Sequence, residues 1–214
     1  MGGYVETNGI GLRANPSLVA RRHRMRKPAD FLRSSIEVKE AIISSDSLCS
    51  KVEQAAEAIV DACRNGGKVL FCGNGGSAAD AQHLAAELSG RFLFDRPPLD
   101  AEALHCNSSH LTAVANDYSF DEIFARLVKA RGRDGDILVG LSTSGSSPNI
   151  VHALQEARAL RMKTVGFTGS KDGTMDPLCD ILLKVPSTFT PHIQEAHITL
   201  GHYICEAVEL QLFG

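Results

Sequence analysis

The sequence lacks any apolar run near the ~18 residues that a membrane-spanning helix needs, and its first residues contain no hydrophobic core of a signal peptide. It also lacks a C-x-x-C pair. The cysteines are scattered and several fall in apolar segments, which argues against a disulfide framework or a thiolate metal site; they are Cys49, Cys63, Cys72, Cys106, Cys179 and Cys205. The length of 214 residues, with 43% hydrophobic residues, suits one soluble domain. We therefore expect a cytoplasmic protein with reduced cysteines and no membrane partner.

An excess of positive charge is also missing, because the formal net charge is −3. Residues 1–27 hold six Lys or Arg and one Glu, a net charge of +5, which leaves −8 for the remainder. This balance argues against a nucleic-acid partner for the globular part. The basic segment is either an arm for an anionic surface or an extension without fixed structure. We favour the extension, with Met25 as a candidate alternative start, and expect a single domain over residues 28–214.

A glycine-rich turn follows the first predicted strand. The apolar run at residues 69–72 is typical of a buried strand, Gly73-Asn74-Gly75-Gly76 is a turn, and Ser77 is placed to cap a helix over residues 78–89. Backbone N–H groups at such a helix N-terminus favour an anion. The turn matches neither G-x-G-x-x-G nor a P-loop, and an ordinary α/β turn remains an alternative.

His83 and Glu87 lie four residues apart on the helix after this turn, hence on one face. A histidine and a carboxylate beside an anion site indicate catalysis. A solvated helix face with the same spacing is the alternative.

A second strand–turn–helix unit lies later in the chain. The strand at residues 136–141 leads into Ser142-Thr143-Ser144-Gly145-Ser146-Ser147-Pro148-Asn149, and a helix follows over residues 150–160. Hydroxyls and free N–H groups at a helix start suit a phosphate. A turn in which Ser147 merely caps its own helix is the alternative. Both turns are expected at the carboxyl edge of one sheet, where they can share a ligand.

Alternating strands and helices predict a three-layer α/β/α sandwich around a central parallel sheet. Further strands are expected at residues 101–106, 163–169 and 181–185, and a further helix at 120–130. Residues 111–115 are apolar, and Asn116-Asp117 is interpreted as a turn.

Two amphipathic helices, at residues 29–45 and 47–65, precede the first strand and offer more apolar surface than one domain needs, so we expect them to pack in an oligomer.

The last predicted helix begins at Thr190, as its cap, and ends near Phe213. Gln194 and His202 lie two turns apart and about 80° around this helix, so both can face one pocket. His197 lies well round from His202 and is interpreted as structural.

Four segments together closely resemble phosphoheptose isomerases, enzymes of the sugar-isomerase (SIS) domain family that act on sedoheptulose 7-phosphate. They are GNGGSAADAQHLAAELSGRF, AVANDY, LSTSGSSPN and IQEAH-x4-H, and the resemblance covers residues 30–214. It implies the SIS fold and conversion to D-glycero-D-manno-heptose 7-phosphate through a cis-enediol, the first step toward ADP- or GDP-heptose. It also implies a homotetramer with sites between subunits.

The resemblance assigns roles to residues of this chain. It implies that Glu87 and His202 are catalytic, and that one zinc ion per subunit is held by His83, Glu87, Gln194 and His202. Substrate contacts are implied for Asn74, Gly75, Gly76, Ser77, Arg91, Asn116, Asp117, Ser142, Thr143, Ser144, Ser147 and Gln194.

The implied chemistry suits the residue types. One carboxylate can move a proton between C1 and C2, and a histidine can exchange protons with the two oxygens near neutral pH. A glutamate bound to zinc is a weaker base, so both roles of Glu87 stay open. The rival interpretations are a non-catalytic SIS-domain protein that binds partner proteins, of the replication-initiator-associated type, and a regulator that binds sugar phosphates. The presence of all four residues of the implied zinc set favours the enzyme.

Overall fold

The computed structural model describes residues 26–214. Five strands form one fully parallel sheet: β1 (Val69–Gly73), β2 (Ala101–Ala103), β3 (Ile137–Leu141), β4 (Lys163–Thr168) and β5 (Ile181–Lys184). Their order in the sheet is β2-β1-β3-β4-β5. The order therefore reverses next to β1, because β2 lies on one side of it and β3 on the other. Ligands of open parallel sheets bind beyond the carboxyl ends of strands at such a point.

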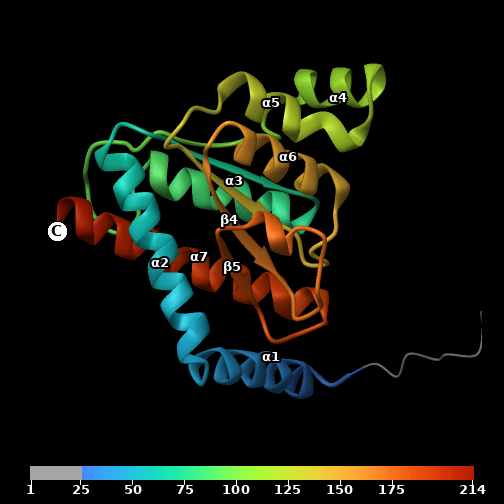
Figure 1. Ribbon diagram of the computed structural model, residues 1–214. Coiled ribbons are helices and arrows are strands. Elements are labelled where there is room, and N and C mark those ends of the chain that lie inside the picture. Colours follow the sequence, from blue (N-terminus) through green and yellow to red (C-terminus); the bar gives the residue numbers. More distant parts are fainter. Residues whose placement is uncertain (1–25) are drawn as a thin grey trace, which may run out of the picture.

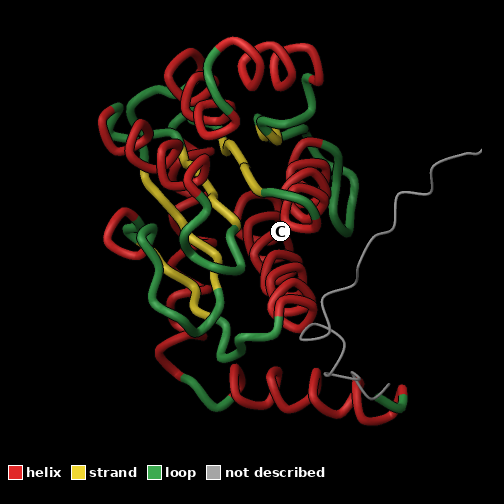
Figure 2. The backbone as a smooth tube through the Cα atoms, turned by 90° about the vertical axis from the view of Figure 1, so that its right-hand side faces the viewer, coloured by secondary structure: helices red, strands yellow, loops and turns green. Residues whose placement is uncertain are grey.

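Helices cover both faces of the sheet, which confirms the predicted α/β/α sandwich (Figure 1). The helices are α1 (Pro28–Ile43), α2 (Asp46–Arg64), α3 (Gly76–Ser89), α4 (Ser108–Asp117), α5 (Ile123–Arg131), α6 (Pro148–Ala159) and α7 (Thr190–Phe213), with the 3-10 turns η2 (Phe120–Glu122) and η3 (Asp176–Leu178). Figure 2 shows the strands between the two helical layers.

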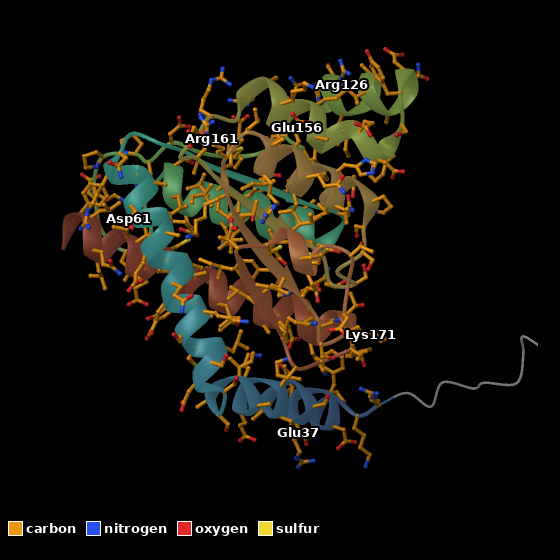
Figure 3. All side chains as sticks on the ribbon, in the orientation of Figure 1. Glu37, Asp61, Arg126, Glu156, Arg161 and Lys171 are labelled. Atoms are coloured by element: carbon orange, nitrogen blue, oxygen red, sulfur yellow. The ribbon has the colours of Figure 1, made fainter. Side chains whose placement is uncertain are left out.

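Each central strand is buried on both faces, so its apolar side chains alternate between two cores. Val69 and Phe71 of β1 pack with α2, α3 and α7, whereas Leu70 and Cys72 pack with α4, α5 and α6. This double coverage explains why the strands are continuous apolar runs instead of an alternation with polar residues. Charged side chains such as Asp61 and Arg161 stand on the outer surface (Figure 3).

Several predicted boundaries were wrong, for local reasons. Ser77 does not cap α3: the N-cap is Gly75, whose φ of +55° turns the chain so tightly that the helix begins at Gly76. Thr190 is likewise the first residue of α7, after Phe189. Asn116 and Asp117 are not a turn but the last residues of α4, a helix that Asn107 caps by accepting a hydrogen bond from the His110 N–H at 3.0 Å.

α1 stands apart from the sandwich and lies against the start of α7 (Figures 1 and 2). It exposes Leu32, Ile36 and Ile43, which is the surplus of apolar surface expected from the sequence. Whether this surface packs in an oligomer stays a prediction, and residues 1–25 of the predicted extension lie outside the described part. Among residues 26–214, every helix is too short or too polar to span a bilayer.

Candidate active site

The glycine turn and the serine turn meet at the carboxyl ends of β1 and β3, the neighbouring strands at which the order reverses. This placement confirms the predicted common edge. A reciprocal amide pair joins the two turns: Asn74 Nδ2 donates to Asn149 Oδ1 at 2.9 Å, and Asn149 Nδ2 donates to Asn74 Oδ1 at 2.8 Å. Asn149 is 1% exposed. The sequence analysis gave Asn149 no role, although it ends the serine-rich motif.

The substitution Asn149→Ala is expected to lower the free energy of unfolding by about 1 to 3 kcal/mol, because it leaves the Asn74 amide without its partner. Urea denaturation measures this loss. Since each amide bonds the other, Asn74→Ala should cost about as much, and the double variant little more than either single one. Additive losses in this cycle would contradict a coupled pair.

The hydroxyl groups of the serine turn face one another instead of capping α6. Ser142 is buried, and its Oγ atom lies 3.0 Å from Ser147 Oγ and 3.4 Å from Ser144 Oγ. Ser147 occupies the N-cap position, yet its side chain makes no capping hydrogen bond. Pro148 has no N–H, and the N–H groups of Ile150 and Val151 donate to the Ser147 carbonyl, each at 3.0 Å. The hydroxyls of the turn and the Asn149 N–H at the start of α6 are therefore the donors that an anion at this helix N-terminus can use. These contacts argue against the alternative of a turn that only caps its own helix.

His83, Glu87 and His202 converge where α3 and α7 pack side by side. His83 Nε2 lies 3.2 Å from Glu87 Oε1 and 2.9 Å from His202 Nε2. Gly201, next to His202, permits the close approach, because a Cβ there would lie 2.6 Å from Leu84 of α3. The three side chains are partly exposed, so a substrate can reach them.

These three residues suit a divalent cation. One donor atom from each lies within 4.8 Å of the other two. Two imidazole nitrogens and a carboxylate oxygen are also the donor types of catalytic zinc sites, which leave a position open for substrate. The imidazole nitrogens of neutral histidines and the carboxylate oxygen all carry lone pairs, so a cation between them replaces lone-pair repulsion with attraction. His83, Glu87 and His202 therefore fit a metal ion.

Gln194, the fourth expected ligand, lies against the glycine turn: a Cβ on Gly76 would come 2.4 Å from Gln194 Nε2. This contact places its amide at the start of α3, beside the turn that is expected to contact the sugar. Its binding to zinc stays a prediction.

Two neighbouring ionisable groups have shifted pKa values. Asp80, one turn before His83, has a raised pKa because of burial, partly offset by the nearby His83 charge, and its Oδ2 atom lacks a hydrogen-bond partner among the described residues. The sequence analysis missed Asp80, whose carboxylate when charged adds to the attraction for a cation.

Burial lowers the pKa of His197 to about 4, and its Nε2 donates to the Thr168 carbonyl at 3.2 Å. The burial of His197 and its bond to the Thr168 carbonyl agree with the interpretation of this residue as structural.

The remaining expected contacts do not join this cluster within residues 26–214. Asn116 Nδ2 donates to Asp117 Oδ1 at 2.9 Å, and both residues are exposed at the end of α4, which lies beyond α5 and α6 (Figure 1). Arg91 is exposed in the segment after α3.

Comparison with known proteins agrees with this architecture. The sequence matches the SIS domain family over residues 30–169. It is 52% identical over 177 residues to the phosphoheptose isomerase of Burkholderia pseudomallei, covering 83% of this chain and 90% of that protein. The chain therefore belongs to the SIS domain family and, within it, to the phosphoheptose isomerases.

Two solved structures share the fold of this chain but differ in their sequence identity to it. The structure of the phosphoheptose isomerase of Neisseria gonorrhoeae superposes with a TM-score of 0.80 at 42% identity, covering 85% of this chain and 96% of that one. The sugar isomerase domain of the RpiR transcription factor of Sphaerobacter thermophilus gives a TM-score of 0.57 at 19% identity, covering 87% and 92%. That second likeness concerns the fold alone. The fold therefore occurs beyond the phosphoheptose isomerases, and membership of the narrower family rests on the identities of 52% and 42%.

Proposed function

We propose that this protein is an aldose–ketose isomerase that converts sedoheptulose 7-phosphate to D-glycero-D-manno-heptose 7-phosphate, the first step toward ADP- or GDP-heptose. The observation that carries the proposal is the convergence of His83, Glu87 and His202 on α3 and α7. The helix α3 begins at the glycine turn, which the Asn74–Asn149 amide pair joins to the serine turn. A regulator or partner-binding protein has no need of that cluster. Six free cysteines agree with a cytoplasmic enzyme.

The reaction moves one proton between C1 and C2 and a second between their oxygens, through a cis-enediol. Glu87 takes the carbon proton and returns it to the neighbouring carbon, and His202 exchanges the oxygen proton. Ser142, Thr143, Ser144 and Ser147 hold the phosphate with the N-terminus of α6, while Asn74, Gly75, Gly76 and Ser77 contact the sugar. Anchoring the distant phosphate fixes C1 and C2 against Glu87, so remote binding energy lowers the barrier.

One zinc ion per subunit would be held by His83, Glu87, Gln194 and His202. When bound, it would polarise the substrate carbonyl and stabilise the negative charge that develops on its oxygen. His83 then acts only as a ligand, and Glu87 serves as ligand, base or both.

Zinc at 100 times its dissociation constant is expected to raise the free energy of unfolding by about 2.7 kcal/mol. His83→Ala should abolish most of this increase, measured as the zinc-dependent shift in melting temperature after chelation. His152→Ala is the matched control, because His152 Nδ1 pairs with Glu122 Oε1 at 3.0 Å outside the site. An equal loss in both variants, or a full shift in His83→Ala, would refute zinc binding at this cluster.

We further propose a homotetramer in which each site is completed by a neighbouring subunit. The supporting observations are an apolar groove of about 410 Å³ between α1, α2 and α7, and the exposed Tyr203 and Leu210 on α7. Asn116 and Asp117 lie away from the cluster of His83, Glu87 and His202 in their own chain. In the proposed tetramer they contact the substrate in the site of a neighbouring subunit. Arg91 is assigned to the pocket on the family resemblance.

The test of the function is incubation of the protein with sedoheptulose 7-phosphate in deuterium oxide, with and without zinc, followed by NMR of C1 and C2. An aldoheptose 7-phosphate carrying deuterium at C2 is the expected product. Folded, zinc-loaded protein that gives neither exchange nor product would refute this substrate.

A further inference from the structure

Behind the cluster of His83, Glu87 and His202 lies a buried ion pair to which neither the sequence nor the family resemblance assigned a role. Arg96 Nε lies 3.0 Å from Glu209 Oε1, and each side chain is 1% exposed. Removing two charges from water is costly, and a buried pair is often no more stabilising than apolar residues of the same size. Stability alone therefore explains this pair poorly.

The Arg96 guanidinium closes the end of α3. Its Nη2 donates to the carbonyl of Glu87 at 2.8 Å, and its Nη1 donates to the carbonyls of Leu88 and Gly90 at 2.7 and 3.2 Å. Nη1 also donates to the Pro97 carbonyl at 3.0 Å. The last carbonyls of a helix have no partner within it, and a cation there is favourable. Arg96 thus holds the backbone of the residue that carries the proposed base.

The Glu209 carboxylate holds the other side of the cluster. It accepts hydrogen bonds from the N–H groups of Phe92 and Leu93 at 2.9 and 2.6 Å. The Phe92 ring packs against the His202 ring, with centroids 5.8 Å apart. Glu209 follows His202 by seven residues on α7, which is two turns along the same face. One buried carboxylate therefore links the His202 helix to the segment that packs on His202.

We propose that Arg96 and Glu209 are positioning residues for the isomerase reaction, which together fix the distance between the Glu87-bearing end of α3 and the His202-bearing part of α7. This inference rests on the proposed function. Neither residue touches the substrate. Their effect is on the geometry with which Glu87, His202 and zinc meet C1 and C2.

The test is the double substitution Arg96→Met/Glu209→Leu, which replaces the pair with apolar side chains of similar size. Such replacements commonly keep the fold, whereas loss of one partner leaves a buried charge alone. We expect kcat to fall about 10- to 100-fold, because a displacement of about 1 Å has that effect, while KM changes less than threefold. Zinc affinity should fall at least tenfold, and this readout does not depend on turnover.

Lys68 and Asp136, which directly precede β1 and β3, provide a matched control that does not contact His83, Glu87 or His202. Lys68 Nζ lies 2.7 Å from Asp136 Oδ2, and the Asp136 carboxylate accepts hydrogen bonds from two backbone N–H groups, as Glu209 does. Lys68→Met/Asp136→Leu should lower stability but leave kcat and zinc affinity within twofold of the wild type. If the Arg96/Glu209 double variant fails to fold, Arg96→Lys replaces it, because lysine keeps the charge without the five-donor fork.

The outcomes separate the two proposals. Wild-type protein without isomerase activity refutes the proposed function, and zinc affinity then decides whether the pair positions the cluster. Active wild type together with a folded Arg96/Glu209 variant of unchanged kcat and zinc affinity overturns the positioning role. Equal losses in the Lys68/Asp136 control overturn it as well, because they would show a general effect of stability.

Discussion

Glu87→Gln is expected to lower kcat by about 10² to 10⁴-fold, which is the usual contribution of a positioned base. The amide has nearly the shape of the carboxylate but cannot take a proton from carbon. Glu87 sits inside the rigid α3 and its side chain is 22% exposed, so the variant should fold and still bind the sugar phosphate. Steady-state kinetics, calorimetric binding of sedoheptulose 7-phosphate and deuterium exchange at C2 measure the three parts of this expectation.

The zinc content of Glu87→Gln distinguishes the role of Glu87 as a base from its role as a zinc ligand. Retained zinc with lost exchange assigns Glu87 mainly as the base, whereas loss of zinc assigns it mainly as a ligand. Glu57→Gln is the matched control, since Glu57 is an exposed carboxylate of α2 outside the site. Full turnover by Glu87→Gln would contradict the mechanism and favour a protein that only binds sugar phosphates or partner proteins.

Local sequence signals were sufficient for the sheet and for the two turns. β1 and β3 are short apolar runs that lead into a glycine turn and a serine turn, and a helix follows each turn. Because parallel strands carry these turns at the same edge, the meeting of the Asn74 turn with the Ser142 turn followed without knowledge of the strand order. The spacing of His83 and Glu87 likewise placed both on one helix face.

Features that depend on contacts distant in the sequence were not predictable in the same way. Nothing in the residues around Arg96 or Glu209 indicates that the fold buries their side chains against each other. The reciprocal bonding of Asn74 and Asn149 also needs the tertiary structure. α4 was missed because its five-residue apolar run has no clear period, so the Asn107 cap was the only local signal for a helix.

Phosphate recognition is the second property for which a large effect is expected. Ser144→Ala/Ser147→Ala should lower kcat/KM for sedoheptulose 7-phosphate by about 10² to 10⁴-fold, because each hydrogen bond to a charged group contributes about 1.5 to 3 kcal/mol. The double variant should lose no capping bond of α6, but it removes both hydroxyl partners of the buried Ser142, so we expect it to fold with a free energy of unfolding lower by about 1 to 3 kcal/mol. Ser146→Ala is the control in the same turn: its hydroxyl accepts from the Thr174 N–H at 3.2 Å, so its loss should change kcat/KM less than threefold.

The same variants, assayed with unphosphorylated sedoheptulose, distinguish phosphate binding from damage to the catalytic cluster. Wild-type protein should prefer the 7-phosphate strongly, because binding energy from the phosphate is used to hold C1 and C2 at Glu87. In the Ser144/Ser147 variant this preference should collapse while the slow reaction of sedoheptulose itself is unchanged. A preserved preference would mean that the phosphate binds elsewhere. A parallel loss on both substrates would mean that the turn supports the fold of the site and not the recognition of the phosphate.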